Sequence, residues 1–212
     1  MLREMTMLRL LFALLLSACV AGCHSSEKTA PAAPKAATTK PSAGPVNDPL
    51  WNLLRGGGQV VVMRHAQTTP GTSDPPNFKL GDCSTQRNLS DEGRAQAKAI
   101  GEMFKQRDVI FADVMASPYC RTLDTARLVA GRVEANDALI MLPDDAPDRD
   151  ARIATLRQLA AGKPTRGNTL LVTHQPNITA ITNLKPAMGE MVVLTPDSHG
   201  KFRVAGLLHV AD

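Results

Sequence analysis

Short apolar runs alternate with longer amphipathic stretches along most of the chain. Four runs have the length and apolar content of strands, and they span Gln59 to Met63, Val114 to Ala116, Ala138 to Pro143 and Thr169 to Thr173. The first and the last are almost wholly apolar, which is typical of strands buried on both faces of a parallel sheet. The pattern therefore predicts four strands separated by helical segments.

Three amphipathic stretches predict helices. The stretch "NLSDEGRAQAKAIGEMFKQR" offers Ser90 as an N-cap and places its apolar residues on one stripe. A second helix is predicted from Pro118 to a stop at Gly131, because proline favours the first turn of a helix and glycine the position after its end. The third is predicted over Asp148 to Ala161, with Gly162 at its end.

The C-terminal part has a different pattern. Glu190 to Leu194 and Phe202 to Val210 are two alternating runs around "TPDSHGK", whose Pro, Asp and Gly favour a hairpin. The alternation of strands and helices before this hairpin favours a parallel sheet with helices on its faces. We therefore predict an α/β fold, namely a three-layer α/β/α sandwich with a mostly parallel central sheet and a C-terminal antiparallel hairpin.

The first residues have the pattern of a targeting segment. Two arginines precede the apolar run Leu10 to Leu16, which is typical of a secretory signal and shorter than the roughly 20 residues of a transmembrane helix. Cys19 and Cys23 both resemble the lipidated cysteine of bacterial lipoproteins, and Cys23 allows the longer apolar core. We predict a lipoprotein-type signal over residues 1–23 with lipidation at Cys23 and Cys19 as the alternative, while an ordinary cleaved signal stays open.

The next segment, residues 24–48, predicts a tether. It is rich in Ala, Pro, Thr, Ser and Lys and has no large apolar residue before Val46, so it cannot offset its own ordering entropy. Residues 49–212, a length of about 160, suit one domain with one sizeable core. The expected location is the periplasmic face of a bacterial membrane, where acyl chains on the N-terminal cysteine hold the protein.

Composition narrows the classes of ligand. The formal net charge is only +4 and aromatic residues make up 3% of the chain, so the stacking platform of a single-stranded nucleic-acid binder is missing. We therefore expect no nucleic-acid partner. A small anionic ligand needs only a local basic pocket, which the overall charge does not exclude.

Four strongly polar residues follow the predicted strands. Arg64 and His65 come after the first strand, Arg121 one turn after the second, and His174 after the fourth. Ligands of open α/β sheets bind beyond the carboxyl ends of the strands, so these side chains are expected to meet there. Arginines placed in this way grip phosphate or carboxylate with a planar fork.

Four motifs around these residues resemble the histidine phosphatase superfamily, also called phosphoglycerate mutase-like. They are "VVMRHAQT", "RNLSDEGRAQA", "SPYCRT" and "LVTHQPNI", in the family's order, from about Gln59 to Leu194. The resemblance implies a nucleophilic histidine at His65, phosphate-gripping arginines at Arg64 and Arg121, and a second pocket histidine at His174.

Two departures from the family pattern bear on its branches. Ala66 stands where glycine is commonest, and Gln175 stands where the phytase branch has its proton-donating aspartate. Together with the short domain, Gln175 favours the small-phosphatase type of branch 1. In the family the acid lies between the second arginine and the second histidine, which indicates Asp144 or Asp145, although both also suit a turn before a helix. Glu190 is a further candidate.

Several residues are candidates for secondary roles. Arg87, in "RNLS", resembles a family segment that helps to set substrate specificity, with a solvated arginine before an N-cap as the alternative. Thr68, Ser117 and Asn177 are candidates for hydrogen bonds to phosphate oxygens, and each of them could instead hold its own loop. The exported location also allows Cys83 and Cys120 to form a disulfide, with two free thiols as the alternative.

The predicted function is that of an exported phosphomonoesterase with small phosphorylated substrates, no metal and no cofactor. His65 would become phosphohistidine while Arg64, Arg121 and a protonated His174 stabilise the transferring phosphoryl group. Two alternatives stay open at this stage. One is a phosphoglycerate mutase-type phosphotransferase, and the other is a non-catalytic module that binds a phosphoryl ligand.

Overall fold

The computed structural model describes residues 49–209. The predicted signal, the lipidation candidates Cys19 and Cys23, and the tether all lie outside the described residues. Within this range, no helix has the length and apolar character needed to cross a membrane.

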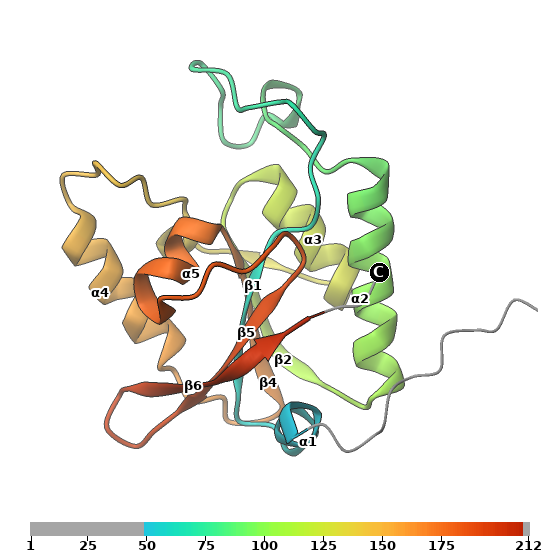
Figure 1. Ribbon diagram of the computed structural model, residues 1–212, viewed down its shortest axis with the longest axis vertical. Coiled ribbons are helices and arrows are strands. Elements are labelled where there is room, and N and C mark those ends of the chain that lie inside the picture. Colours follow the sequence, from blue (N-terminus) through green and yellow to red (C-terminus); the bar gives the residue numbers. More distant parts are fainter. Residues whose placement is uncertain (1–48, 210–212) are drawn as a thin grey trace, which may run out of the picture. The chain divides into compact units, whose positions relative to one another are not determined.

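The described chain is built on one six-stranded sheet with the order β3-β2-β4-β1-β5-β6 (Figure 1). Strands β3, β2, β4 and β1 are parallel, whereas β5 runs antiparallel to β1 and β6 antiparallel to β5. The strands are β1 (Val60–Arg64), β2 (Phe111–Ala116), β3 (Glu134–Ala135), β4 (Asn168–Thr173), β5 (Met191–Pro196) and β6 (Phe202–Leu208).

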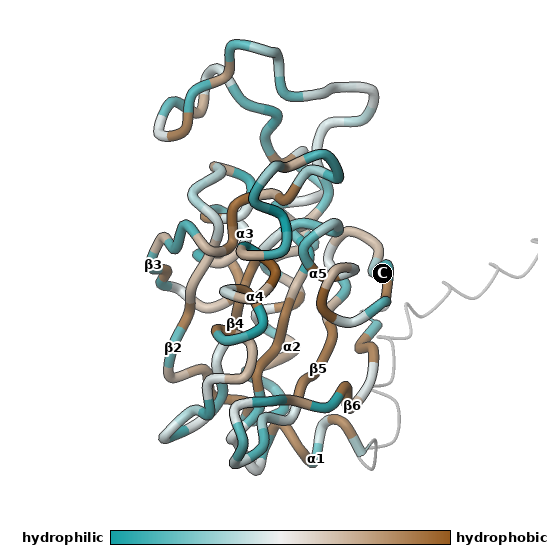
Figure 2. The backbone as a smooth tube through the Cα atoms, turned by 90° about the vertical axis from the view of Figure 1, so that its left-hand side faces the viewer, coloured by the Kyte–Doolittle hydropathy of each residue, from teal (hydrophilic) through white to brown (hydrophobic). Residues whose placement is uncertain are grey.

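Five helices cover the two faces of this sheet (Figure 1). Alternation along β1 sends Val61 and Met63 into one apolar cluster and Val60 and Val62 into the other. The central strands β4 and β5 are accordingly among the most hydrophobic segments, whereas the edge strand β6 is partly hydrophilic (Figure 2). The first cluster is covered by α1 (Pro49–Gly56), α2 (Asp91–Gln106) and α3 (Cys120–Ala130), and the second by α4 (Arg149–Ala160) and α5 (Gln175–Thr182).

The predicted fold class is confirmed, and the helix signals account for much of it. Ser90 caps α2 by accepting the backbone N–H of Gly93 at 3.1 Å. Gly131 ends α3 in the left-handed conformation, with a φ of 74°, which glycine adopts without strain. The C-terminal hairpin pairs as β5 and β6.

One predicted strand is wrong, and two helices were not predicted. Residues 138–143 contain the end of a 3-10 turn, Asp137–Leu139, and then extended chain, whereas the edge strand is Glu134–Ala135. Leu139 and Leu142 are buried, so this apolar run serves as cover for the sheet and not as a strand. The short helices α1 and α5 lacked a recognised periodic signal.

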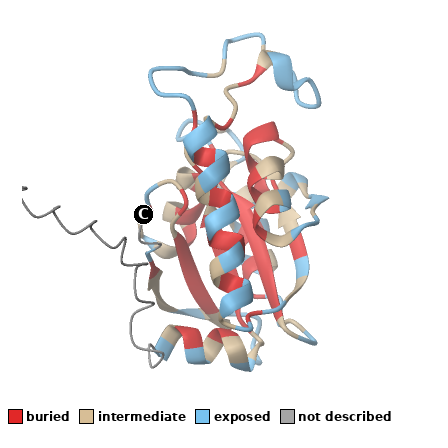
Figure 3. Cartoon of the chain, turned by 90° about the vertical axis from the view of Figure 1, so that its right-hand side faces the viewer, coloured by how far each residue is buried: buried red, intermediate tan, exposed pale blue. Residues whose placement is uncertain are grey.

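A long segment follows β1 and lies beyond the carboxyl ends of the parallel strands (Figure 1). It contains only the 3-10 turn Cys83–Thr85 and is largely exposed at its outer end (Figure 3). We refer to residues 69–88 as the outer segment. It returns to the sheet edge at Leu89, which pairs with Thr68 in an isolated bridge, and the chain then enters α2.

Candidate active site

His65 is held at the carboxyl end of β1. Its backbone N–H donates to Thr173 O of β4 at 3.1 Å, so the position of the residue is set by the central sheet. Its ring Nδ1 lies 2.8 Å from Ala66 O. A carbonyl only accepts hydrogen bonds, so Nδ1 carries the ring proton and Nε2 keeps its lone pair.

The surroundings keep His65 uncharged. Burial, and then the charges of Arg121, Arg64 and Arg87, lower the pKa of His65 to about 3, even though the bond to Ala66 opposes the shift. At neutral pH this imidazole is therefore neutral, with Nε2 unprotonated. That is the state a histidine nucleophile requires.

His174 follows β4 and lies beside His65. The two ring centroids are 5.7 Å apart, and Nε2 of His174 is 3.0 Å from the hydroxyl of Ser117, which is fully buried. Burial, and then the charge of Arg121, lowers the pKa of His174 well below its ordinary value. In the free site His174 is therefore neutral, whereas the protonated His174 predicted from the sequence concerns the transition state with substrate bound. A bound phosphoryl dianion would oppose this shift.

Three guanidinium groups surround the histidine pair, and we call Arg64, Arg87 and Arg121 the arginine cluster. Each is close enough to lower the pKa of His65. Arg121 is fully buried, its Nη1 lies 3.1 Å from Asp74, and its guanidinium lies over the ring of Tyr119 at 4.3 Å.

Several N–H groups of the arginine cluster have no hydrogen-bond acceptor among the described residues. Nε of all three arginines and Nη2 of Arg121 are buried and have no partner within residues 49–209. Unpaired buried donors are costly, and charged ones more so, which makes these N–H groups a site for an oxyanion. The open Nε and Nη2 of Arg121 form the fork that fits two phosphate oxygens.

The outer segment is fastened beside Arg121. Cys83 and Cys120 form a disulfide with a Cα–Cα distance of 5.7 Å, and Cys120 is the first residue of α3. The side chain of Gln86 accepts the backbone N–H of Cys120 at 2.9 Å. The disulfide and the Gln86 hydrogen bond place the adjoining Arg87 beside Arg121 and the histidine pair.

The predicted acids have different surroundings. Asp144 and Asp145 are exposed, and Asp144 forms an ion pair with Arg149 at 3.4 Å. This environment agrees with the alternative of a turn before a helix. Glu190 accepts the backbone N–H of Ala187 at 2.7 Å and pairs with His209, although it lies near enough to Arg64 to interact electrostatically. None of these three side chains is hydrogen-bonded to the arginine cluster or to the histidine pair in the described structure.

Two of the remaining predicted side chains contact neighbouring residues and not the arginine cluster or the histidine pair. The amide of Asn177 accepts the N–H of Leu142 at 2.9 Å and donates to Ile140 O at 2.9 Å. Thr68 is buried, with its hydroxyl 3.8 Å from the sulfur of Met188. Of the secondary candidates, only Arg87 and Ser117 contact the described site directly.

Ala66 is accommodated by the core. Its side chain is fully buried in the first apolar cluster, and its backbone N–H donates to Thr125 Oγ1 at 3.0 Å. The methyl group that replaces the family's usual glycine therefore contacts the apolar core.

Sequence reasoning missed Asp74 and Tyr119. Asp74 joins the backbone N–H of Arg87 to the side chain of Arg121, and Tyr119 packs between Arg121 and His174. The available signals were an aspartate before two prolines and an aromatic residue in a chain that has only one tyrosine. Neither signal specifies a partner so distant in sequence.

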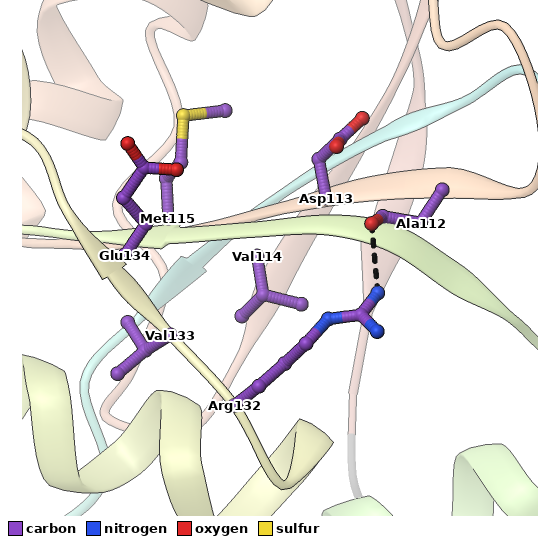
Figure 4. A pocket seen from close by; sticks show the side chains of 7 residues that line it. All are labelled: Ala112, Asp113, Val114, Met115, Arg132, Val133 and Glu134. Atoms are coloured by element: carbon purple, nitrogen blue, oxygen red, sulfur yellow. Dashed lines mark hydrogen bonds between the residues drawn. The ribbon is translucent and has the colours of Figure 1, made fainter.

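A separate hollow lies along the edge of the sheet between β2 and β3 (Figure 4). Its only guanidinium, that of Arg132, donates to Ala112 O at 2.7 Å and also to Phe111 O, at the amino end of β2. No histidine lines it. This hollow therefore lacks the chemistry found at the carboxyl ends of the strands. Between residues 49 and 209, no group of three or more His, Cys, Asp and Glu side chains is arranged to hold a metal ion.

Comparison with known proteins agrees with this geometry. The model of the histidine phosphatase superfamily (branch 1) matches residues 60–141. The fold is similar to that of SixA from Agrobacterium tumefaciens, at 19% identity and a TM-score of 0.51, covering 73% of this chain and 99% of that one.

Two further structures have the same fold. A mycobacterial hydrolase is 20% identical with a TM-score of 0.51, covering 71% of this chain and 98% of its own. The protein histidine phosphatase SixA, solved with tungstate, is 18% identical with a TM-score of 0.50. The match covers 71% of this chain and 96% of that one. No curated protein matches the chain by sequence.

Proposed function

We propose that this chain belongs to the histidine phosphatase superfamily, whose model matches residues 60–141, and that it is an exported phosphatase that hydrolyses small phosphomonoesters without a metal ion, through a phosphohistidine on His65. One observation carries the proposal. A neutral histidine with a free Nε2 stands beside three arginines whose buried N–H groups have no partner in the described part of the chain.

The first half of the reaction transfers the phosphoryl group to the protein. Nε2 of His65 attacks phosphorus while the bond to the leaving oxygen breaks. Negative charge spreads over the equatorial oxygens in this transition state, and fixed guanidinium donors lower its energy. The open Nε and Nη2 of Arg121 are oriented before substrate arrives, since Asp74 and Tyr119 hold that side chain.

The second half restores His65. Water attacks the phosphorus of the phosphohistidine while the P–Nε2 bond breaks, so inorganic phosphate leaves and the lone pair returns to His65. This step requires a base that takes a proton from water, whereas the first half requires an acid that gives a proton to the leaving oxygen. His174 and Ser117 stand beside His65 and together offer a donor and an acceptor. The dianion raises the proton affinity of His174, so this pair carries the proton when substrate is bound.

The decisive experiment is hydrolysis of an aryl phosphate by the full-length protein in the presence of a chelator. We expect turnover, incorporation of acid-labile phosphate, and loss of both in His65→Ala. His199→Ala is the matched control, because His199 is exposed in the hairpin turn and its ring pairs only with Ser198 in the described structure. Turnover that persists in His65→Ala would rule out the phosphohistidine route.

A second candidate is a module that binds a phosphoryl ligand without catalysis. The observation in its favour is that Asp144, Asp145 and Glu190 make no hydrogen bond to the described site. Vanadate binding by wild-type protein without any turnover between acidic and neutral pH would favour this function over hydrolysis.

The proposal of export and membrane anchoring rests on the N-terminal sequence. Cys23, with Cys19 as the alternative, would carry the acyl chains on the periplasmic face of a bacterial membrane. Incorporation of a labelled fatty acid in wild-type cells and its loss in Cys23→Ser would support the anchor. If the label is lost only in Cys19→Ser, Cys19 is the lipidated residue. A wild-type protein that takes up no label would refute lipidation.

A further inference from the structure

Asp74 is the one acidic side chain hydrogen-bonded to the arginine cluster within residues 49–209. It reaches the cluster from the outer segment, 47 residues before Arg121 in the sequence. Its exposure is 14%, whereas the side chain of Arg121 is completely buried. Asp74 therefore lies on the solvent side of the most deeply buried cation in the site.

The contacts of Asp74 leave the catalytic edge of Arg121 open. Both carboxylate oxygens lie 3.1 Å from Nη1 of Arg121, while Nε and Nη2 keep no partner among the described residues. The Tyr119 ring packs against the face of the same guanidinium. One nitrogen and one face are thus fixed, and the fork that suits two phosphate oxygens remains available.

The same carboxylate also fixes Arg87. Oδ1 of Asp74 accepts the backbone N–H of Arg87 at 2.8 Å, and Arg87 O lies 3.5 Å from Nη1 of Arg121. A single side chain therefore connects two members of the cluster that come from different parts of the chain.

The charge of the site depends on this carboxylate. The three arginines contribute three positive charges and Asp74 one negative charge, and Glu190 lies close enough to Arg64 to interact with it electrostatically. The site therefore keeps a positive excess for a phosphomonoester, which carries close to two negative charges at neutral pH. Without Asp74, the three cations would repel one another more strongly in a buried space.

We propose that Asp74 is a positioning residue, which orients Arg121 and Arg87 for the phosphoryl group and offsets one charge of the arginine cluster. This rests on the proposed function. Asp74 acts through the arginines and need not touch the substrate.

Two substitutions separate orientation from charge, with inorganic vanadate as the probe for the full-length protein. Asp74→Asn keeps an oxygen that can accept both N–H groups and removes the charge. It is expected to bind vanadate about two- to fivefold more tightly, because a negative charge near the anion is lost. Asp74→Ala removes the orienting bonds as well, and its affinity should fall about 10- to 100-fold.

Asp82→Ala is the matched control. Asp82 lies in the same outer segment, and its carboxylate accepts hydrogen bonds only from Ser84 in the described structure. Its removal should leave vanadate affinity within about twofold of wild type. Equal weakening in Asp74→Ala and Asp82→Ala would attribute the effect to general loosening of the segment and overturn the proposal.

A double-mutant cycle with Arg121→Lys tests the route of action. Lysine has no fork to orient, so in that background Asp74→Ala should bind vanadate within about twofold of Asp74→Asn. An equally large gap between the two variants in both backgrounds would overturn the proposal. An Asp74→Asn variant that binds no more tightly than wild type would also do so, and this outcome can be read even if Asp74→Ala fails to fold. Wild-type affinity in Asp74→Ala would also do so, and it refutes this inference alone. Wild-type protein that fails to bind vanadate at all would refute the proposed function too.

Discussion

The two halves of the candidate site are built in different ways. Arg64, His65 and His174 directly follow or end buried parallel strands, so the sheet fixes their positions. Arg87 and Asp74 belong to the outer segment, which has little regular structure and depends on a disulfide and side-chain hydrogen bonds. In the proposed function, the sheet would supply the reacting groups, and the outer segment would add Arg87 and the carboxylate that orients Arg121.

The largest effect should come from Arg121, which is common to both halves. Arg121→Ala removes a preorganised pair of donors, and kcat/KM for an aryl phosphate should fall by about 10³-fold. Steady-state kinetics checks this result, with Arg203→Ala on β6 as a control, because Arg203 is exposed and distant in sequence from the site motifs. A fall of less than about tenfold would remove Arg121 from the phosphoryl site.

A large effect is also expected where α2 packs against the chain that follows His65, on the sheet side of the site. A Cβ at Gly93 would lie 1.9 Å from Gln67 O, so Gly93→Ala forces α2 away from the chain that follows His65. We expect the free energy of unfolding to fall by about 2 to 4 kcal/mol, together with a loss of activity. Denaturant unfolding measures the change. Gly56→Ala, where a Cβ meets nothing within 4 Å, should be nearly neutral in comparison.

Removal of the disulfide should weaken the segment half more than the sheet half. The bridge closes a loop with a sequence separation of 37, which corresponds to about 4 kcal/mol in the chain-entropy description. In Cys83→Ser with Cys120→Ser, KM and the Kd for vanadate should rise about tenfold while kcat changes less, because the histidine pair is held elsewhere. An equal loss in kcat would show that the two halves are not separable.

The smallest effect concerns the pH dependence of stability. Both histidines have a folded-state pKa below the unfolded value, so the unfolded chain takes up protons that the folded chain does not. Their contribution is complete above about pH 6.5 and is lost as the pH falls towards the folded pKa, by up to about 1.4 kcal/mol per histidine per pH unit. Between pH 7 and pH 5, the thermal unfolding temperature should therefore fall less for His65→Asn than for wild type. Identical slopes would contradict the neutral buried state of His65.

The sequence predicted most where local signals and tertiary demands agree. The Ser90 cap and the Gly131 stop act over a few residues, and the apolar, β-branched run at β1 matches the strand that the structure has there. The 138–143 run was misassigned because an apolar pattern of six residues fits both a strand and a covering segment, and only packing against the sheet decides between them.

The sequence by itself determined the class of the fold, most of the central strands and long helices, and the four polar residues that follow those strands. These depend on periodicity, which is a local property. Only the tertiary structure decided which side chains complete the site. Asp74 meets Arg121 and Cys83 meets Cys120 across 47 and 37 residues of chain, and the tautomer of His65 depends on the carbonyl that its ring reaches. Pairings of this kind follow from the folded path of the chain, which no local pattern encodes.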